Sequence, residues 1–309
     1  MKTRTLTALC SAVVLLAFVL FLLFPARYLQ CVRDGVSLWA VSVLPAALPF
    51  LFLTGLLAGT PLFARLARLL APFFRLFGVS GTGGCCACLS MLSGYPAGAR
   101  TVADAYARGA ISQHEMLRAA ALASTSGPAF LVGVAGAAMA KDATIGWAML
   151  CAHFAGILLP VFLLARFAPR ERRTGAIALP GTSNLPQTLS TSVLAVLTVG
   201  GAVALFYCFG CMLSDLLSPL PLTETAGGFL VGLLEMTSGC ARLLAAPTAL
   251  HVSLATFLVT FGGLCVFVQQ WTFLAGTGVP LGKFLLVKLA QAIVAALLAY
   301  PLALGCGAS

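Results

Sequence analysis

The sequence is dominated by long stretches that contain no charged side chain. Such runs extend from Leu6 to Phe24, from Ala143 to Ala165, from Thr188 to Ser214 and from Leu243 to Gly282. Charged residues make up 8% of the chain, whereas soluble domains carry about 25%. Because about 20 apolar residues cross the hydrocarbon core of a bilayer, the sequence predicts an all-α, polytopic transmembrane helical bundle.

The basic residues lie at the edges of apolar runs or in short loops. Arg166, Arg170, Arg172 and Arg173 form the densest cluster, which the positive-inside rule places in the cytoplasm. The net charge of +10 is therefore explained by topology and by anionic lipid headgroups, and we expect no nucleic-acid partner. The first run, from Leu6 to Phe24, resembles a signal peptide, but it has the length of a span and no small-residue cleavage site follows it. We expect a retained first helix.

Glycine, proline and hydroxyl residues interrupt several of the apolar segments. Each half of the chain has a short glycine-rich segment ending in a polar turn, followed by a second apolar segment with a polar break. The four breaks are expected near Gly94, Gly127, Gly239 and Gly263. Paired interruptions of this kind are typical of transporters built from two repeats, whose broken or re-entrant helices meet at the membrane midplane.

This pattern predicts four parts of the chain: an N-terminal helix with its loop over 1–34, a first half over 35–168, a basic cytoplasmic linker over 169–187, and a second half over 188–309. Pro45, Pro49 and Pro61 predict a bent or re-entrant helix within Gly35–Ala64. The following segment places Arg65, Arg68 and Arg75 opposite a row of Leu and Phe side chains, which indicates an interfacial helix in the membrane plane.

Glu235 is the carboxylate set within an apolar stretch, where an ionisable group costs at least about 2.5–3.5 kcal/mol. It either contacts a coupling ion or solute, or it pairs with Arg242 or sits at a helix end among headgroups. Gly94 and Gly98 either open a site at a broken helix or pack helices as a G-x-x-x-G pair. The candidate substrate-binding residues are those of the four breaks and their polar neighbours: Ser93, Gly94, Tyr95, Pro96, Gly98, Arg100, Ser124, Ser126, Gly127, Glu235, Thr237, Ser238, Gln269 and Gln270. We expect Lys288 to extend to the membrane interface.

Signatures of soluble enzymes are missing from the sequence. No nucleotide-binding loop, zinc-protease motif or serine-hydrolase elbow is found. Cys85, Cys86 and Cys88 are close enough in sequence to suggest a metal site, but no second ligand pair follows them. Their role as small side chains packed in a membrane helix explains them better. We therefore expect no catalytic residue, no metal and no cofactor.

Four segments carry a resemblance to a known family. The stretch Leu89–Arg100 is similar to the S-G-Y-P-x-G-[AS]-[KR] turn of the YlbJ-like sporulation integral membrane proteins, which belong to the nucleoside-recognition (Gate) domain group. Ser124–Gly133, Gly232–Gly239 and Phe261–Gln269 follow in the family's order, so that the likeness covers roughly residues 35 to 300. Two departures occur: Ser and Gly replace the family's usual asparagine around Ser124–Pro128, and a histidine usual near Phe267 is missing.

The resemblance implies a fold similar to the concentrative nucleoside transporters and a role in endospore formation. Members of the family are thought to carry dipicolinate, a small anion, across the membrane around the forespore. The partners it implies are the lipid bilayer, a dipicolinate-like or nucleoside-like solute and a proton or sodium ion as coupling ion, with a homo-oligomer as a further expectation. A membrane transporter of a small polar, anionic solute is thus the first hypothesis. The alternative is a non-transporting membrane scaffold for sporulation, suggested by the two departures.

Overall fold

The computed structural model describes residues 2–58, 60–167 and 184–308. Within these residues the chain is helical and contains no β-strand, which confirms the all-α prediction. Four segments are long and apolar enough to cross a membrane, and two bent helix pairs raise the number to as many as six. The four are α8 (Ala143–Arg166), α9 (Leu185–Leu217), α14 (Leu281–Gly305), and Ala249–Thr277, which combines α12 (Ala249–Phe261), α13 (Gly263–Leu274) and the 3-10 turn η4 (Ala275–Thr277). The protein is an integral membrane protein.

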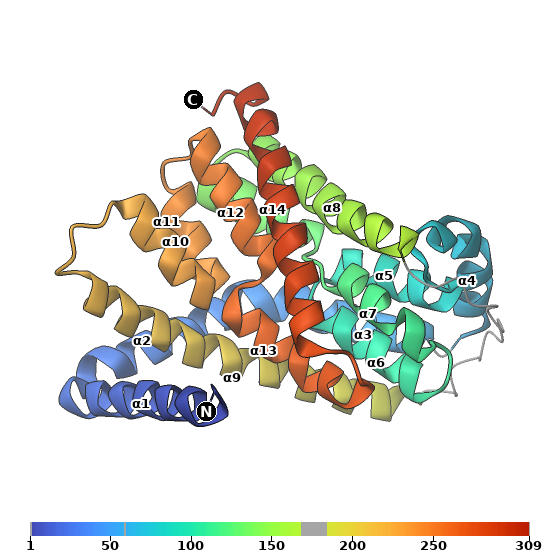
Figure 1. The fold of residues 1–309 in the computed structure, drawn as a ribbon, viewed down its shortest axis with the longest axis horizontal. Coiled ribbons are helices and arrows are strands. Elements are labelled where there is room, and N and C mark those ends of the chain that lie inside the picture. Colours follow the sequence, from blue (N-terminus) through green and yellow to red (C-terminus); the bar gives the residue numbers. More distant parts are fainter. Residues whose placement is uncertain (1, 59, 168–183, 309) are drawn as a thin grey trace.

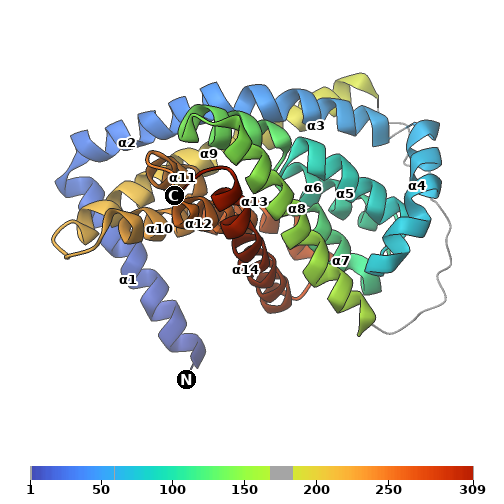
Figure 2. The ribbon, with the colours of Figure 1, turned by 90° about the horizontal axis from the view of Figure 1, so that it is seen from above.

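The longest helix, α9, runs antiparallel to a second long helix made of α2 (Pro25–Leu38), the π-helical turn η1 (Trp39–Val43) and α3 (Leu44–Ala58). Figures 1 and 2 show α2 and α3 in blue beside α9 in yellow. Small residues allow this close approach: a β-carbon added to Gly35 would lie 2.8 Å from the Cα of Ala204, and one added to Gly200 would meet the Trp39 ring at 2.6 Å. The wide turn η1 directly precedes Pro45, which cannot donate a backbone hydrogen bond.

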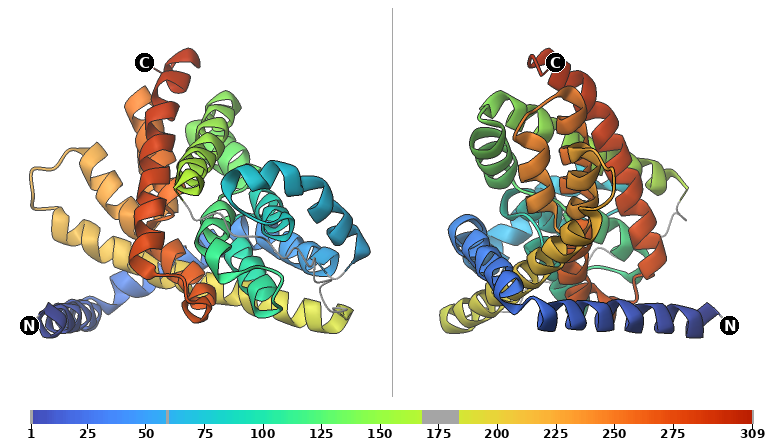
Figure 3. Two further views of the ribbon diagram at one scale, coloured as in Figure 1. Left: turned by 45° about the vertical axis from the view of Figure 1, so that its right-hand side comes forward. Right: turned by 90° about the vertical axis from the view of Figure 1, so that its left-hand side faces the viewer.

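The N-terminal helix α1 (Lys2–Leu23) turns away from the bundle. The Ser11–Leu23 part of α1 makes an angle of 108° with the following helix, and Figure 3 shows α1 extending away from the other helices. From Ser11 onward its side chains are largely exposed, with Val14 at 69% and Phe18 at 61%, so that lipid is their natural neighbour in a membrane.

A second sharp bend separates α3 from α4 (Pro61–Phe74), and the axes differ by 90°. The bent helix predicted for this region is therefore present. The buried side of α4, with Phe63, Ala67 and Phe74, packs against α5 (Gly81–Ser93). The structure thus places much of the apolar face of α4 against protein, and its position in the membrane plane stays a prediction.

Two helical hairpins and two interrupted helices occupy the centre of the molecule. The hairpins are α5 with α6 (Ala97–Ala107), and α10 (Glu224–Leu234) with α11 (Met236–Leu244). The interrupted helices are α7 (Gln113–Ala123) with the π-helix η3 (Ala129–Ala140), and α12 with α13. Three breaks lie where the sequence predicts them. The fourth lies at Glu235 and not at Gly239, because Gly239 belongs to α11 and packs against Gly232 across the hairpin.

The predicted linker lies mostly outside the described residues. Residues 184–187, the end of the predicted range, form the N-cap and first turn of α9, where the side chain of Asn184 accepts a hydrogen bond from the backbone N–H of Gln187 at 2.9 Å.

Candidate functional site

The tip of the α5–α6 hairpin touches the break between α7 and η3. A β-carbon on Gly94 would lie 3.3 Å from the backbone nitrogen of Gly127, and one on Gly127 would lie 2.8 Å from the carbonyl oxygen of Leu92. Gly94 also has a φ of +76°, which other residues rarely adopt. Glycine at both positions therefore lets two unwound backbone segments lie side by side.

The α10–α11 hairpin makes a matching contact with the break between α12 and α13. Gly262 and Gly263 both have positive φ, and a β-carbon on Gly263 would lie 2.9 Å from the carbonyl oxygen of Gly232. The two halves are joined by Tyr95, whose hydroxyl donates to the carbonyl of Val259 at 2.8 Å. All four breaks therefore converge on one place, although they are far apart in the sequence.

A cavity of about 360 Å³ lies at this junction, which is within the size range of small-molecule sites. Its remaining walls come from the α2–η1–α3 helix, η3, α9 and α13, and most of their side chains are apolar. Eight of the fourteen candidate residues line it: Ser93, Gly94, Tyr95, Ser126, Gly127, Glu235, Thr237 and Gln269.

Glu235 forms the tip of the α10–α11 hairpin and is 2% exposed. Its carboxylate accepts hydrogen bonds from the backbone N–H of Thr237 at 2.9 Å, and from the backbone N–H and hydroxyl of Ser238, both at 2.7 Å. Arg242 does not pair with it, since its guanidinium donates to the hydroxyl of Ser214 at 3.2 Å. The negative charge is thus offset by the N-terminus of α11, and the carboxylate still borders the cavity.

A buried polar cluster that includes His153 and Lys288 forms hydrogen bonds with the break between α7 and η3. His153 is fully buried, and its Nε2 accepts a hydrogen bond from the backbone N–H of Ser126 at 3.0 Å. That bond requires the ring proton to be on Nδ1, and the Nδ1 atom lies 2.8 Å from the hydroxyl oxygen of Thr260 on α12. His153 therefore links both interrupted helices, a role that its isolated position in the sequence did not reveal.

Lys288 belongs to the same cluster, and its predicted extension to the membrane interface is wrong. The side chain is 1% exposed and donates to the carbonyl of Ser124 at 2.8 Å. Lys288 is one of three side chains that donate hydrogen bonds to carbonyls at the C-terminal end of α7. The Gln291 amide donates to the carbonyl of Ala121 at 3.1 Å, and the Ser90 hydroxyl donates to the carbonyl of Ala123. A cation is favourable at a helix C-terminus, and this explains its burial.

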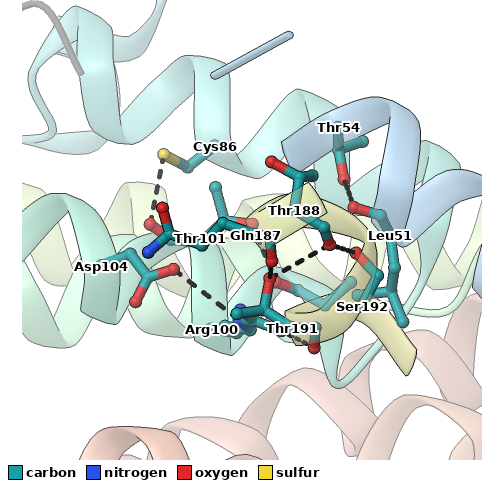
Figure 4. A network of polar contacts seen from close by, with 11 residues as sticks. Leu51, Thr54, Cys86, Arg100, Thr101, Asp104, Gln187, Thr188, Thr191 and Ser192 are labelled. Atoms are coloured by element: carbon teal, nitrogen blue, oxygen red, sulfur yellow. Dashed lines mark hydrogen bonds and ion pairs between the residues drawn. The ribbon is translucent and has the colours of Figure 1, made fainter. Parts of the chain in front are cut away.

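Arg100 is not part of the cavity, contrary to the sequence-based expectation. Its guanidinium donates to the carbonyl of Thr191 on α9 at 2.7 Å and lies 3.7 Å from the carboxylate of Asp104 (Figure 4). It thereby anchors α6 to the first turns of α9. The other candidates that do not line the cavity are Pro96, Gly98, Ser124, Ser238 and Gln270.

The cysteine cluster gives no support for a metal site. Cys85 and Cys86 are buried within α5. Within the described residues, no group of three or more His, Cys, Asp or Glu side chains is arranged to hold a metal ion.

Two comparisons with known proteins found similarities to this chain. Residues 40–145, from η1 to α8, match the Gate model, described as nucleoside recognition. The chain is also similar to the sporulation integral membrane protein YlbJ of Bacillus subtilis (strain 168), with 28% identity over 313 aligned positions that cover 88% of this chain and 76% of the relative. No solved structure matches it. The resemblance seen in the four sequence segments is thereby confirmed: the chain is similar to YlbJ along most of its length and to the Gate model over residues 40–145.

Proposed function

We propose that the protein is a membrane carrier for a small polar solute, which binds in the cavity at the four breaks. The observation that carries the proposal is that two hairpin tips and the α7–η3 break line one cavity, while the α12–α13 break packs directly against the second hairpin and α13 completes the wall. Unwound backbone at membrane depth is tolerated only where protein or a water-filled cavity surrounds it. A bundle without a solute to bind has no need of four such breaks in one place.

The order of elements supports a repeat of the kind found in concentrative nucleoside transporters. In each half a helix (α3 or α9) precedes a hairpin (α5–α6 or α10–α11), an interrupted helix (α7–η3 or α12–α13) and a final helix (α8 or α14), and the first half has α4 as an additional helix after α3. The two long helices lie antiparallel, which is the arrangement that inverted repeats produce. We propose that the halves are related in this way and that they rearrange around the cavity during transport.

The lining suggests the chemical class of the solute. Hydroxyl groups, an amide and one carboxylate are set among apolar walls that include Phe50 and Phe130. This combination suits a small, flat molecule with polar edges, such as dipicolinate or a nucleoside. Glu235 is the one charged residue in this lining, so an anionic solute would enter together with a proton or a sodium ion that neutralises the site. The similarity to YlbJ supports a role in sporulation.

Uptake into proteoliposomes tests the proposal through Glu235. Glu235→Ser keeps an oxygen that caps α11 but removes the charge, whereas Glu235→Asp keeps both. We expect Glu235→Ser to reduce the uptake rate of dipicolinate or nucleoside by about 100-fold, equivalent to about 2.7 kcal/mol, while Glu235→Asp retains a measurable part. Both variants should elute as the folded protein. Uptake by Glu235→Ser at the wild-type rate would remove the carboxylate from the mechanism.

The scaffold hypothesis predicts a different result for the wild-type protein. A scaffold would show neither uptake nor solute binding and would instead retain a stable protein partner through purification. Of the two departures that suggested it, Gly127 lines the cavity, while Phe267 stacks on Trp271 at 6.2 Å between ring centres and does not line it.

A further inference from the structure

Two smaller cavities continue from the central cavity along α9. The second cavity, of about 250 Å³, is lined by Tyr207, Gly210 and Cys211 of α9 and by Thr237, Ser238 and Arg242 of α11, among others. Thr237 also lines the central cavity, so that the two spaces adjoin at this residue. The turn that divides them is the first turn of α11, which Glu235 caps.

The third cavity, also of about 250 Å³, continues in the same direction. It is lined by Ser214 and Ser218 of α9, by Thr223 and Glu224 at the start of α10, and by Arg242. Val231 and Arg242 line both the second and the third cavity. The three spaces therefore follow one another along α9 towards its C-terminal end.

One face of α9 borders all three cavities in order. Its lining residues are Val199 and Val203, then Tyr207, Gly210 and Cys211, then Ser214, Leu217 and Ser218. Intervals of three and four residues keep them on one side of the helix. From Val203 to Ser218 the helix rises about 22 Å, which is a large part of the hydrocarbon thickness of about 30 Å. The side chains become more polar along this path.

The outer end of the path lies among charged groups. Asp215 of α9 forms an ion pair with Arg27 and accepts a hydrogen bond from the hydroxyl of Tyr28 at 3.2 Å. Glu224 and Arg242 are exposed at the same end. Charged side chains are costly in hydrocarbon, so this end faces water or headgroups.

We propose that the solute enters and leaves the central cavity along this path, and that Arg242 favours anions at its outer part; the proposal rests on the carrier function proposed above. Arg242 is the one cation in the lining of the three cavities, whereas Glu224 and Glu235 are the anions. Displacement of the α10–α11 tip would join the first two cavities. A fixed charge beside a narrow path raises the local concentration of the oppositely charged solute.

Native cysteines provide a test that does not depend on transport. In proteoliposomes, the anionic, membrane-impermeant reagent sulfonatoethyl methanethiosulfonate should modify Cys211, which lines the second cavity, at least about tenfold faster than Cys151 or Cys208. Cys151 is exposed on the spanning helix α8, where lipid surrounds it, and Cys208 is buried one turn before Cys211. Mass spectrometry locates the modified residue. Modification of Cys211 as slow as that of Cys151 would overturn the path.

The role of Arg242 is tested with the same reaction. Arg242→Glu should slow modification of Cys211 by the anionic reagent about tenfold, while the neutral methyl methanethiosulfonate reacts at an unchanged rate. Arg65→Glu, an exposed residue of α4, should change neither rate. An unchanged ratio of the two rates in Arg242→Glu would remove Arg242 from charge selection. Rapid labelling of Cys211 in a protein that takes up no solute would contradict the carrier function and leave the aqueous path standing.

Discussion

At the scale of single residues, the two glycines of the G-x-x-x-G spacing serve different purposes. Gly94 lines the cavity and adopts a positive φ, as a broken-helix site requires. Gly98 packs within the hairpin: a β-carbon there would lie 2.0 Å from the hydroxyl of Ser90 and 2.2 Å from the carbonyl of Ala123. The G-x-x-x-G spacing alone favoured helix packing and formation of a binding site about equally. In the structure Gly94 belongs to the site and Gly98 to the packing.

Gly98→Ala is expected to destabilise the protein by about 1–3 kcal/mol, because the clash with the backbone of α7 cannot be relieved by a side-chain rotation. The free energy of unfolding in detergent micelles measures this loss. Gly133→Ala is the matched control, since a β-carbon at Gly133 meets nothing within 4 Å. Equal stability of the two variants would mean that α6 can shift away from α7 without cost.

His153 and Lys288 show what residue types alone do not disclose. A lone histidine and a lysine near a helix end have ordinary explanations in a membrane protein, and neither belongs to a motif. Their partners are backbone groups of residues 124–126, which become free hydrogen-bonding groups only because α7 unwinds there. Such a role is visible only when the break and the side chains behind it are seen together.

At the scale of elements, the antiparallel pairing of α9 with the α2–η1–α3 helix sets the outer wall of the cavity. The apolar runs predicted α9 and a bent or re-entrant helix within Gly35–Ala64, but the pairing of α2 and α3 with α9 depends on small residues that lie opposite each other, such as Gly35 and Ala204. The paths of the helices therefore follow from where the backbones can come close. Arg100 contributes to the same frame, because it ties α6 to the start of α9.

Gly35→Val should weaken this pairing. Its β-carbon would lie 2.8 Å from the Cα of Ala204 and 2.9 Å from the Cβ of Tyr207, so α2 must move away from α9. We expect a loss of about 1–3 kcal/mol in the free energy of unfolding, together with weaker solute binding. Gly201→Val, on the opposing helix α9 but facing open space, should leave both quantities nearly unchanged. A stable Gly35→Val variant with normal solute binding would show that the contact of Gly35 with α9 does not determine the position of the cavity wall.

At the scale of the whole molecule, the protein combines a helical frame with two pairs of interrupted elements. The frame buries small and apolar side chains between helices, and three of the four breaks line one cavity. Only this second feature distinguishes a carrier from a simple bundle. Its consequence is that a bound solute should hold four otherwise separate backbone segments together.

Solute binding should therefore raise the thermal stability of the detergent-purified protein. A ligand present at 100 times its dissociation constant stabilises the folded state by about 2.7 kcal/mol if it does not bind the unfolded chain. Dipicolinate and nucleosides are the first compounds to screen by the shift in apparent melting temperature. Glu235→Ser should reduce the shift for the true solute, and a chemically similar compound that does not fit the cavity should give none. The absence of any shift across both classes would favour the scaffold hypothesis.

The sequence by itself determined that the chain is an integral membrane protein, that it is helical, and that its helices are interrupted near Gly94, Gly127 and Gly263. These properties depend on local composition: uncharged runs need lipid, and glycine, proline and hydroxyl residues weaken a helix wherever they cluster. Only the tertiary structure decided that three of the breaks line one cavity, that the break expected near Gly239 is at Glu235, that Arg100 lies elsewhere and that Lys288 is buried. Those outcomes depend on which backbone groups lose their helical partners and which distant side chains reach them, and that information is not contained in any one segment.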